Sequence, residues 1–237
     1  MPQKDAWDDK GFADRWDGKN HFRDNPGRGE QLDLIVHLLA GGCREDSLIL
    51  DLGSGSGRVE ELIFERIPGV RAVGVDSSHS MMEIALRRLA PYGKRFIPVT
   101  GGMSELEKLP LPEGPYAFAI SVQALHEVPH AEKRRIMASV FDLLSPGGTF
   151  FVLDRVAFEG EALFAEFQGV WERLNRKAEM ENGMTYPEYL ETYRNKDDHV
   201  ATLEEQLSWL REAGFTASCL YLHFNRTLFA ARRPGSG

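Results

Sequence analysis

Three glycines at alternating positions stand between an apolar run and a helical pattern. The run Leu48–Leu52 has the composition of a buried strand, and Val59–Arg66 has the spacing of a helix. Between them lie Gly53, Gly55 and Gly57. Glycine allows a tight turn and a close approach of a ligand to the backbone, and the first turn of a helix offers N–H groups without partners inside the helix. The pattern predicts a nucleotide-type site at the carboxyl end of the first strand.

An acid closes the next apolar run. Asp76 follows Arg71–Val75 and lies 19 residues after Gly57. A carboxylate at the tip of the second strand can accept a hydrogen bond from each of two vicinal ribose hydroxyls, and it would repel a ribose phosphate. The glycine spacing is G-x-G-x-G, whereas the dinucleotide fingerprint is G-x-G-x-x-G. The acid therefore disfavours NADP, and the glycine spacing disfavours an NAD-linked oxidoreductase.

A histidine follows the fourth apolar run, at the same predicted edge of the sheet. His126 comes four residues after Val122, the end of that run. An imidazole with a pKa near the reference of ~6.5 can take a proton from a phenol or an activated carbon acid, and Glu127 could orient the ring. His126 could instead pack under the following helix as a structural residue. Asp154 and Arg155, which close the fifth run, could form an ion pair or a pocket wall.

Strands and helices alternate along the part of the chain that carries these residues. The predicted strands are Leu48–Leu52, Arg71–Val75, Arg95–Val99, Tyr116–Val122 and Thr149–Asp154; the predicted helices are Glu30–Ala40, Val59–Arg66, Ser80–Leu89, Glu132–Leu144 and Leu203–Ala213. Two β-rich segments, Ala217–His223 and Thr227–Ala231, flank a turn at Asn225-Arg226. Continuous apolar strands fit a parallel sheet that is covered on both faces. We therefore predict an α/β, Rossmann-like, doubly wound and mostly parallel seven-stranded sheet that ends in an antiparallel hairpin.

Two regions interrupt this alternation. Residues 1–28 are polar apart from scattered aromatic side chains, and we expect a helical leader that caps a domain formed by residues 29–237. Residues 158–200 are expected to form a helical insertion after the fifth strand. Its helix near 161–180 could pack on the domain, join two copies in a homodimer, or close over a substrate pocket. Three tyrosines of the insertion could line that pocket or pack structurally: Tyr186, Tyr189 and Tyr193.

Composition narrows the classes of protein. The 237 residues carry a net charge of −8, with a pI near 5.4, which argues against broad nucleic-acid or membrane binding. No apolar run reaches the roughly 18 residues that cross a bilayer, and the N-terminus has no apolar core of a secretory signal. Cys43 and Cys219 provide neither a disulfide framework nor metal-site spacing. We expect a cytoplasmic protein without a metal site.

The sequence resembles class I S-adenosylmethionine (SAM)-dependent methyltransferases from about Leu32 to Leu153, and more loosely toward its end. The stretches that carry the resemblance are ILDLGSGSGRV (49–59), VGVDSSHSMM (73–82), LPLPEGPYAFAISVQALHEVP (109–129), LLSPGGTFFVLD (143–154) and TLEEQLSWLREAGF (202–215). The resemblance implies SAM as the cofactor, S-adenosylhomocysteine as the product and a small molecule as the methyl acceptor. Transfer of a methyl group from a sulfonium mainly needs alignment of the acceptor with that methyl group. A base is needed only where the acceptor must lose a proton.

The resemblance also assigns site residues. The methionine part of SAM is assigned to Asp51, Gly53, Ser54, Gly55 and Gly57; the ribose to Asp76 with Ser77; the adenine to Met81; and the methyl position to Ser121 and Gln123. Where the family has a Gly-Asp pair that reaches the adenine amine, this chain has Gly101-Gly102. Adenine recognition is then expected from backbone groups around Gly102 and Met103. Arg23 or Arg28 of the leader region could pair with the methionine carboxylate.

Two other functions stay open. The helix near 161–180 and the ending LHFNRTLFAARR (222–233) are similar to carboxy-SAM synthases, which remodel SAM with a second carboxylate. In those enzymes an arginine of the inserted segment pairs with the extra carboxylate, and Arg194 is the nearest candidate here. A SAM-binding protein without turnover is the other alternative.

Overall fold

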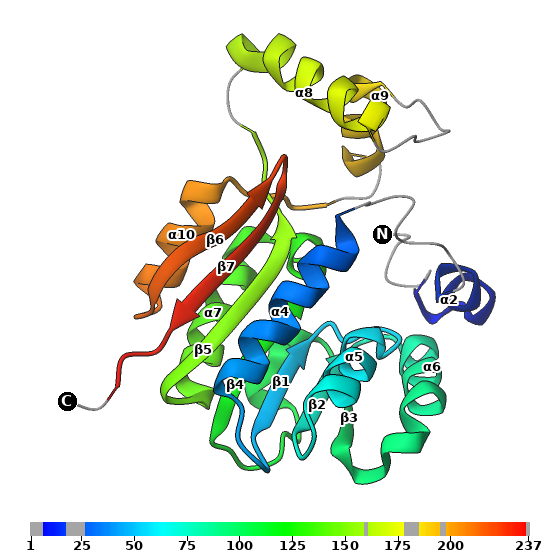
Figure 1. The fold of residues 1–237 in the computed structure, drawn as a ribbon, viewed down its shortest axis with the longest axis vertical. Coiled ribbons are helices and arrows are strands. Elements are labelled where there is room, and N and C mark those ends of the chain that lie inside the picture. Colours follow the sequence, from blue (N-terminus) through cyan, green and yellow to red (C-terminus); the bar gives the residue numbers. More distant parts are fainter. Residues whose placement is uncertain (1–6, 18–26, 159–160, 178–184, 195–197, 236–237) are drawn as a thin grey trace.

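The computed structural model describes residues 7–17, 27–158, 161–177, 185–194 and 198–235 (Figure 1). Its centre is a seven-stranded sheet in the order β3-β2-β1-β4-β5-β7-β6. The strands are β1 (Leu48–Leu52), β2 (Arg71–Asp76), β3 (Phe96–Thr100), β4 (Tyr116–Val122), β5 (Leu144–Arg155), β6 (Thr216–His223) and β7 (Arg226–Arg232). The first five run parallel, while β7 pairs antiparallel with both β5 and β6. The predicted mostly parallel sheet with an antiparallel hairpin is confirmed.

Helices cover both faces of the sheet (Figure 1). They are α2 (Lys10–Asp17), α4 (Arg28–Gly42), α5 (Arg58–Arg66), α6 (His79–Leu89), α7 (His130–Leu143), α8 (Phe164–Lys177), α9 (Tyr186–Arg194) and α10 (Leu203–Glu212), with short 3-10 turns at η1 (Ala90–Arg95), η2 (Met103–Lys108), η3 (Leu125–Glu127) and η4 (Glu161–Leu163). One apolar cluster joins α4, α5 and α6 to the sheet, and a second joins α7 and α10 to it. Strands buried on both faces explain the continuous apolar runs of the sequence.

The predicted boundary before the fifth strand is wrong. The sequence indicates a helix to Leu144 and a loop over residues 145–148, whereas α7 ends at Leu143 and β5 begins at Leu144. Tyr116 pairs with Leu144, and the register then shifts before Phe118 pairs with Thr149. The glycine-rich segment is therefore an irregular start of the strand, since a bulge accommodates residues that a regular strand would exclude.

The hairpin turn also differs by one residue from the prediction. It lies at Phe224 and Asn225, because β7 already begins at Arg226. Phe224 adopts a positive φ of 52°. Its ring contacts the Trp171 ring of α8, with centroids 5.6 Å apart, and the Tyr186 ring at 6.0 Å. The aromatic contacts with the insertion accompany a backbone conformation that a phenylalanine rarely adopts.

The insertion after β5 is helical, as predicted, and it contains no strand within its described residues. Helices α8 and α9 lie together beyond the carboxyl end of β5 (Figure 1). Trp171 of α8 stacks on Tyr189 of α9, with ring centroids 3.9 Å apart. The two ends of the insertion are fastened together where the N–H of Ala157 donates to the carbonyl of Ala201 at 2.9 Å. The insertion therefore leaves and rejoins the domain at one point beside the sheet edge.

Candidate functional site

The glycine loop after β1 has the backbone geometry that only glycine adopts readily. Gly53, Gly55 and Gly57 have φ values of 77°, 55° and 76°. A Cβ on Gly53 would lie 2.3 Å from the Cβ of Ala124, which follows β4. The N–H groups of Gly53 and Ser54 donate to the carbonyl of Val75 in β2. The loop is therefore held between the ends of β2 and β4, at the carboxyl edge of the sheet.

Asp76 joins the end of β2 to this loop. Its Oδ2 accepts the N–H of Gly55 at 2.8 Å, and its Oδ1 accepts the N–H of Ser78 at 2.8 Å. Each oxygen keeps a further lone pair, which a ribose hydroxyl can use. Burial raises the pKa of Asp76, although these backbone hydrogen bonds oppose the shift. Ser78 caps α6 by accepting the N–H of Met81.

Two buried carboxyl groups lie beneath the loop. Asp51 of β1 is 1% exposed and Glu60 of α5 is fully buried. The two carboxyls share a side-chain hydrogen bond with each other. Within the described part of the chain, neither has a side-chain partner on any other residue, and the buried Ser54 hydroxyl has none. Burial and the nearby Glu60 carboxyl raise the pKa of Asp51 well above its usual value, and burial raises that of Glu60 to about 7. At least one of the two carboxyls is therefore protonated below that pH, because close like charges resist joint ionisation.

Glu60 is a buried residue of the site that is absent from the sequence-based predictions. The signal was present, because Glu60, Ile63 and Phe64 have the i, i+3, i+4 spacing of one helix face, and all three are buried in α5. Glu60 differs from the other acids of this helix because it lies on the apolar face, beside the glycine loop. Glu61, the next residue, is instead partly exposed and pairs with Arg88 at 3.3 Å.

The other residues assigned to the cofactor lie around the same edge. Met81 is buried with Ala13 and Ile84, and its methyl group lies 3.5 Å from the position of a Cβ on Gly55. Ser77 is exposed, and Gly102 and Met103 are half-buried at the start of η2. The hydroxyl of Ser121 donates to the carbonyl of Leu52 at 3.0 Å, which joins β4 to β1. Ser121 therefore has a structural contact that the sequence did not indicate.

Gln123 stands at the tip of β4 with an unusual backbone. Its φ is 54°, and its N–H donates to the carbonyl of Leu153 at 2.7 Å. The Oε1 of its side chain accepts a hydrogen bond from Nη1 of Arg28 at 2.8 Å. Arg28 therefore reaches the site from the first residue of α4, whereas Arg23 lies outside the described residues.

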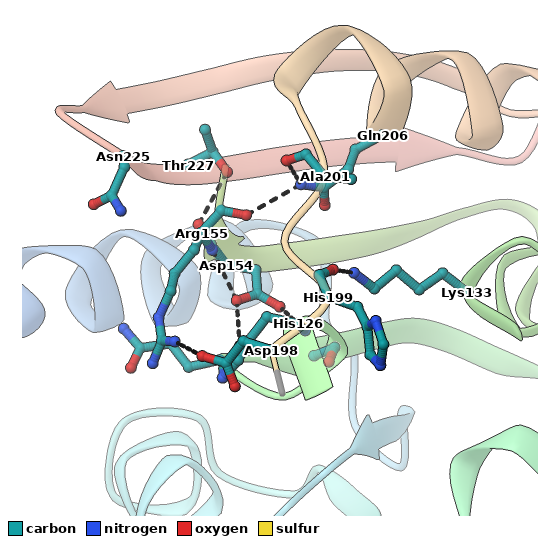
Figure 2. A network of polar contacts seen from close by, with 12 residues as sticks. His126, Lys133, Asp154, Arg155, Asp198, His199, Ala201, Gln206, Asn225 and Thr227 are labelled. Atoms are coloured by element: carbon teal, nitrogen blue, oxygen red, sulfur yellow. Dashed lines mark hydrogen bonds and ion pairs between the residues drawn. The ribbon is translucent and has the colours of Figure 1, made fainter. Parts of the chain in front are cut away.

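His126 is held by the end of β5 (Figure 2). Its Nδ1 lies 2.7 Å from Oδ1 of Asp154, and its N–H donates to Oδ2 of Asp154 at 2.9 Å. Both side chains are at most 5% exposed. The orienting carboxylate is thus Asp154, and the expectation that Glu127 orients the ring is corrected; Glu127 is exposed beside it. Adjacent residues of a 3-10 turn diverge, whereas the neighbouring strand places Asp154 against the ring.

The protonation of this pair follows from charge. Burial alone raises the pKa of Asp154, but the neighbouring His126 and Arg155 outweigh it and hold that pKa at about 2. An ionised carboxylate only accepts hydrogen bonds, so Nδ1 carries the proton in either form of the ring. In the neutral imidazole, Nε2 is then the nitrogen that can accept a proton.

A wider polar network ties the returning end of the insertion to this pair (Figure 2). Arg155 pairs with Asp198 at 2.5 Å, so that Asp154 and Arg155 have separate side-chain partners. The N–H of His199 donates to the carbonyl of His126 at 2.7 Å, and Lys133 of α7 contacts the His199 carbonyl. Burial lowers the pKa of Lys133 to about 8. Residues 198 and 199 are thereby fastened to the ends of β4 and β5.

The insertion supplies aromatic groups nearby. Tyr186 and Tyr189 are buried, and the hydroxyl of Tyr189 accepts from Nδ2 of Asn225 at 2.7 Å. The side chains of Tyr193 and Arg194 are outside the part that the structure describes. Three apolar side chains of η4 and α8 are exposed: Leu163, Phe164 and Val170. Across the described ranges, no helix is long and apolar enough to span a membrane.

Comparison with known proteins agrees with this geometry. Residues 49–148 match the family described as a methyltransferase domain. The chain is 28% identical over 212 residues to a trans-aconitate 2-methyltransferase of Streptomyces coelicolor, covering 86% of this chain and 63% of that protein. It is 26% identical over 164 residues to a carboxy-S-adenosyl-L-methionine synthase of Trichlorobacter lovleyi, covering 67% of this chain and 66% of that protein.

Solved structures share the fold. A phosphoethanolamine N-methyltransferase 2 of Haemonchus contortus, crystallised with phosphomonomethylethanolamine and S-adenosylhomocysteine, superposes with a TM-score of 0.68 at 16% identity, covering 94% of this chain and 57% of that one. The YcgJ protein of Bacillus subtilis superposes with a TM-score of 0.62 at 16% identity, covering 88% of this chain and 100% of that one. At these identities the likeness concerns the fold.

Proposed function

We propose that this chain, which contains a class I SAM-dependent methyltransferase domain, transfers the methyl group of SAM to a small-molecule acceptor. The observation that carries the proposal is the direct link between the glycine loop and the acid of β2, through the hydrogen bond from Gly55 to Asp76. This link joins the glycine-loop backbone to the carboxylate of Asp76, which we propose as the ribose ligand, at one point of the sheet edge. We further propose that residues 29–237 form the catalytic domain and residues 1–28 a cap.

The residues present fit SAM. The positive φ of Gly53 and the nearness of Ala124 exclude a side chain at this position of the loop. The buried Asp51 carboxyl has no side-chain partner in the described chain apart from Glu60. Asp51 and the glycines would hold the methionine part, and Asp76 the ribose. SAM supplies a methyl group bound to a sulfonium, which leaves as a neutral thioether. The chain then needs mainly to align the acceptor and exclude water.

His126 is proposed as the base for acceptors that must lose a proton. Asp154 fixes its Nδ1–H, so that Nε2 can take that proton. The two residues come from the ends of β4 and β5, the same edge that carries the loop. Glu127 stays a candidate for a polar contact with the acceptor, since its exposed side chain follows His126 at the same edge of the sheet.

Two experiments test the proposal, first a measurement of ligand binding and then an assay of methyl transfer. Calorimetry should show uptake of S-adenosylhomocysteine and no comparable uptake of NAD. Purified protein with SAM should then release S-adenosylhomocysteine when given an acceptor from a panel of small carboxylic acids and phenols. trans-Aconitate belongs in the panel because of the Streptomyces relative. Uptake of NAD without uptake of the adenosyl compound would refute the proposal.

A carboxy-SAM synthase reaction is the second candidate. It is favoured by the likeness to the Trichlorobacter enzyme, which extends over 67% of this chain. Mass spectrometry of the ligand that co-purifies with the protein separates the two reactions, because an additional carboxylate on SAM would exclude simple methyl transfer. Tight binding of SAM without S-adenosylhomocysteine release for any acceptor would indicate a non-catalytic binding protein.

A further inference from the structure

Three chain segments meet at one corner of the carboxyl edge: the start of α4, the end of β4 and the start of β7. Arg28 is the first residue of α4, Gln123 follows β4, and Arg226 is the first residue of β7. The start of α4 and the hairpin turn lie at the same end of the molecule (Figure 1). Methyl transfer as proposed above leaves the acceptor site unassigned, and this corner lies at the same carboxyl edge of the sheet as the glycine loop.

Arg28 is a half-buried cation whose side chain contacts a neutral group. Its hydrogen-bond partner is the amide oxygen of Gln123 at 2.8 Å, and none of the ion pairs in the described chain involves it. Burial, followed by repulsion from the charges of Arg58 and Arg226, lowers the pKa of Arg28 to about 10. The group is therefore charged at neutral pH in a place that disfavours its charge.

Nearby arginines differ in this respect. Arg155 pairs with Asp198 at 2.5 Å, and Arg58 pairs with Asp17 at 3.1 Å. Partly buried guanidinium groups usually acquire such an anionic partner, because burial of an unpaired charge is costly. Arg28 therefore has an unmet requirement for an anion that Arg58 and Arg155 do not share.

Gln123 adds a second unused donor. A guanidinium group can only donate, so the atom that faces Arg28 is the amide oxygen and the Nε2 group points elsewhere. That Nε2 atom is buried and has no hydrogen-bond partner in the described residues. The strained backbone of Gln123, with φ of 54°, fixes this amide at the tip of β4. A ligand with two acceptor oxygens, such as a carboxylate, could supply an acceptor to each residue.

We propose that Arg28 and Gln123 form an anion subsite that binds a ligand carboxylate at the tip of β4. A planar guanidinium matches the two oxygens of a carboxylate, and the uncapped first turn of α4 adds N–H groups and a positive dipole end. The inference rests on the proposed function. The carboxylate comes from the methionine end of SAM or from an anionic methyl acceptor.

The test compares Arg28→Gln and Arg28→Lys with a matched control, Arg134→Gln, which removes an exposed arginine that pairs with Glu212 of α10. Calorimetry measures the affinities of S-adenosylhomocysteine and of its decarboxylated analogue. If the subsite holds the methionine carboxylate, Arg28→Gln lowers the affinity for S-adenosylhomocysteine about tenfold or more. The affinity for the decarboxylated analogue should stay unchanged. Arg28→Lys should recover part of the loss, and Arg134→Gln should match the wild type.

A second arm addresses the acceptor. Thermal unfolding of the protein loaded with S-adenosylhomocysteine is followed with citrate and with neutral triethyl citrate. If the subsite holds an acceptor carboxylate, citrate raises the midpoint for wild type and not for Arg28→Gln, while the triester has no effect. The subsite is refuted if Arg28→Gln behaves as wild type in both arms. Failure of wild type to bind S-adenosylhomocysteine at all would refute the proposed function instead.

Discussion

Asp154 binds His126 twice, because one carboxylate oxygen accepts the backbone N–H of His126 at 2.9 Å and the other lies 2.7 Å from its Nδ1. The two residues lie 28 positions apart and are both buried. The hydroxyl of Thr227 in β7 donates to the Asp154 carbonyl at 3.0 Å. The pair therefore joins the turn after β4 to the ends of β5 and β7.

Replacement of Asp154 by Asn should destabilise the fold by about 3 kcal/mol at pH 7, since it breaks a buried charge-assisted pair. The folded-state pKa of about 2 lies below the reference value of 3.8, so this stabilisation is present above about pH 4 and is lost as the pH falls through 2. Urea unfolding from pH 7 to pH 2.5 measures the difference. The control is Asp142→Asn at an exposed position of α7. A difference between Asp154→Asn and wild type that stays constant over this range would contradict the assignment.

Glu60 should make the free energy of unfolding fall as the pH rises, which is the opposite of the effect of Asp154. Burial raises its pKa from 4.5 to about 7, so the folded state holds the proton more tightly than the unfolded state. This contribution is complete below pH 4.5 and is lost as the pH rises through about 7, by on the order of 3 kcal/mol. Glu60→Gln should remove the loss and be more stable than wild type at pH 8. The matched control is Glu65→Gln, an exposed acid of the same helix.

The strands and the loop were predictable because they depend on local pattern. The apolar run Leu48–Leu52 and the glycines after it are adjacent in sequence, and a strand buried on both faces has few alternatives. The start of β5 was not predictable, because the pairing of Leu144 with Tyr116 of β4 requires a bulge within β5 that the glycine-rich sequence does not indicate.

The candidate site was predictable only in part, because its contacts join distant residues. The sequence identified His126 but selected its neighbour Glu127 as the partner, whereas β5 brings Asp154 to the ring. The Arg28–Gln123 hydrogen bond spans 95 positions, and no local pattern indicates it. Contacts of this kind depend on strand order, and several partners were compatible with the sequence.

Gly53 should tolerate no side chain. A Cβ at this position would lie 2.3 Å from the Ala124 Cβ, on a backbone with φ of 77°. Gly53→Ala should destabilise the fold by about 1–3 kcal/mol and lower the affinity for S-adenosylhomocysteine about tenfold. The control is Gly41→Ala near the end of α4, where nothing lies within 4 Å and alanine should be neutral or stabilising. Unchanged affinity in Gly53→Ala would remove the loop from the cofactor site.

Asp17 connects the leader helix α2 to the glycine loop through Arg88. Its Oδ2 lies 2.8 Å from Nη2 of Arg88, whose Nη1 donates to the hydroxyl of Ser56 at 2.8 Å and also contacts the Ser56 carbonyl. Arg58, the first residue after the loop, pairs with the same carboxylate at 3.1 Å. Although partial burial opposes it, the hydrogen bond from Arg88 lowers the pKa of Asp17. The docked leader and the loop conformation therefore share two arginines.

Asp17→Asn should lower the affinity for S-adenosylhomocysteine about three- to tenfold and expose the leader to proteolysis, because the amide cannot hold both arginines. Asp14→Asn is the matched control: Asp14 lies on the same helix and pairs with Arg87 at 3.6 Å, but both side chains are more than half exposed. Exposed pairs contribute little, so this variant should resemble wild type. Calorimetry and limited proteolysis with and without ligand measure both effects. If the ligand protects the leader equally in all three proteins, the leader docks independently of the loop.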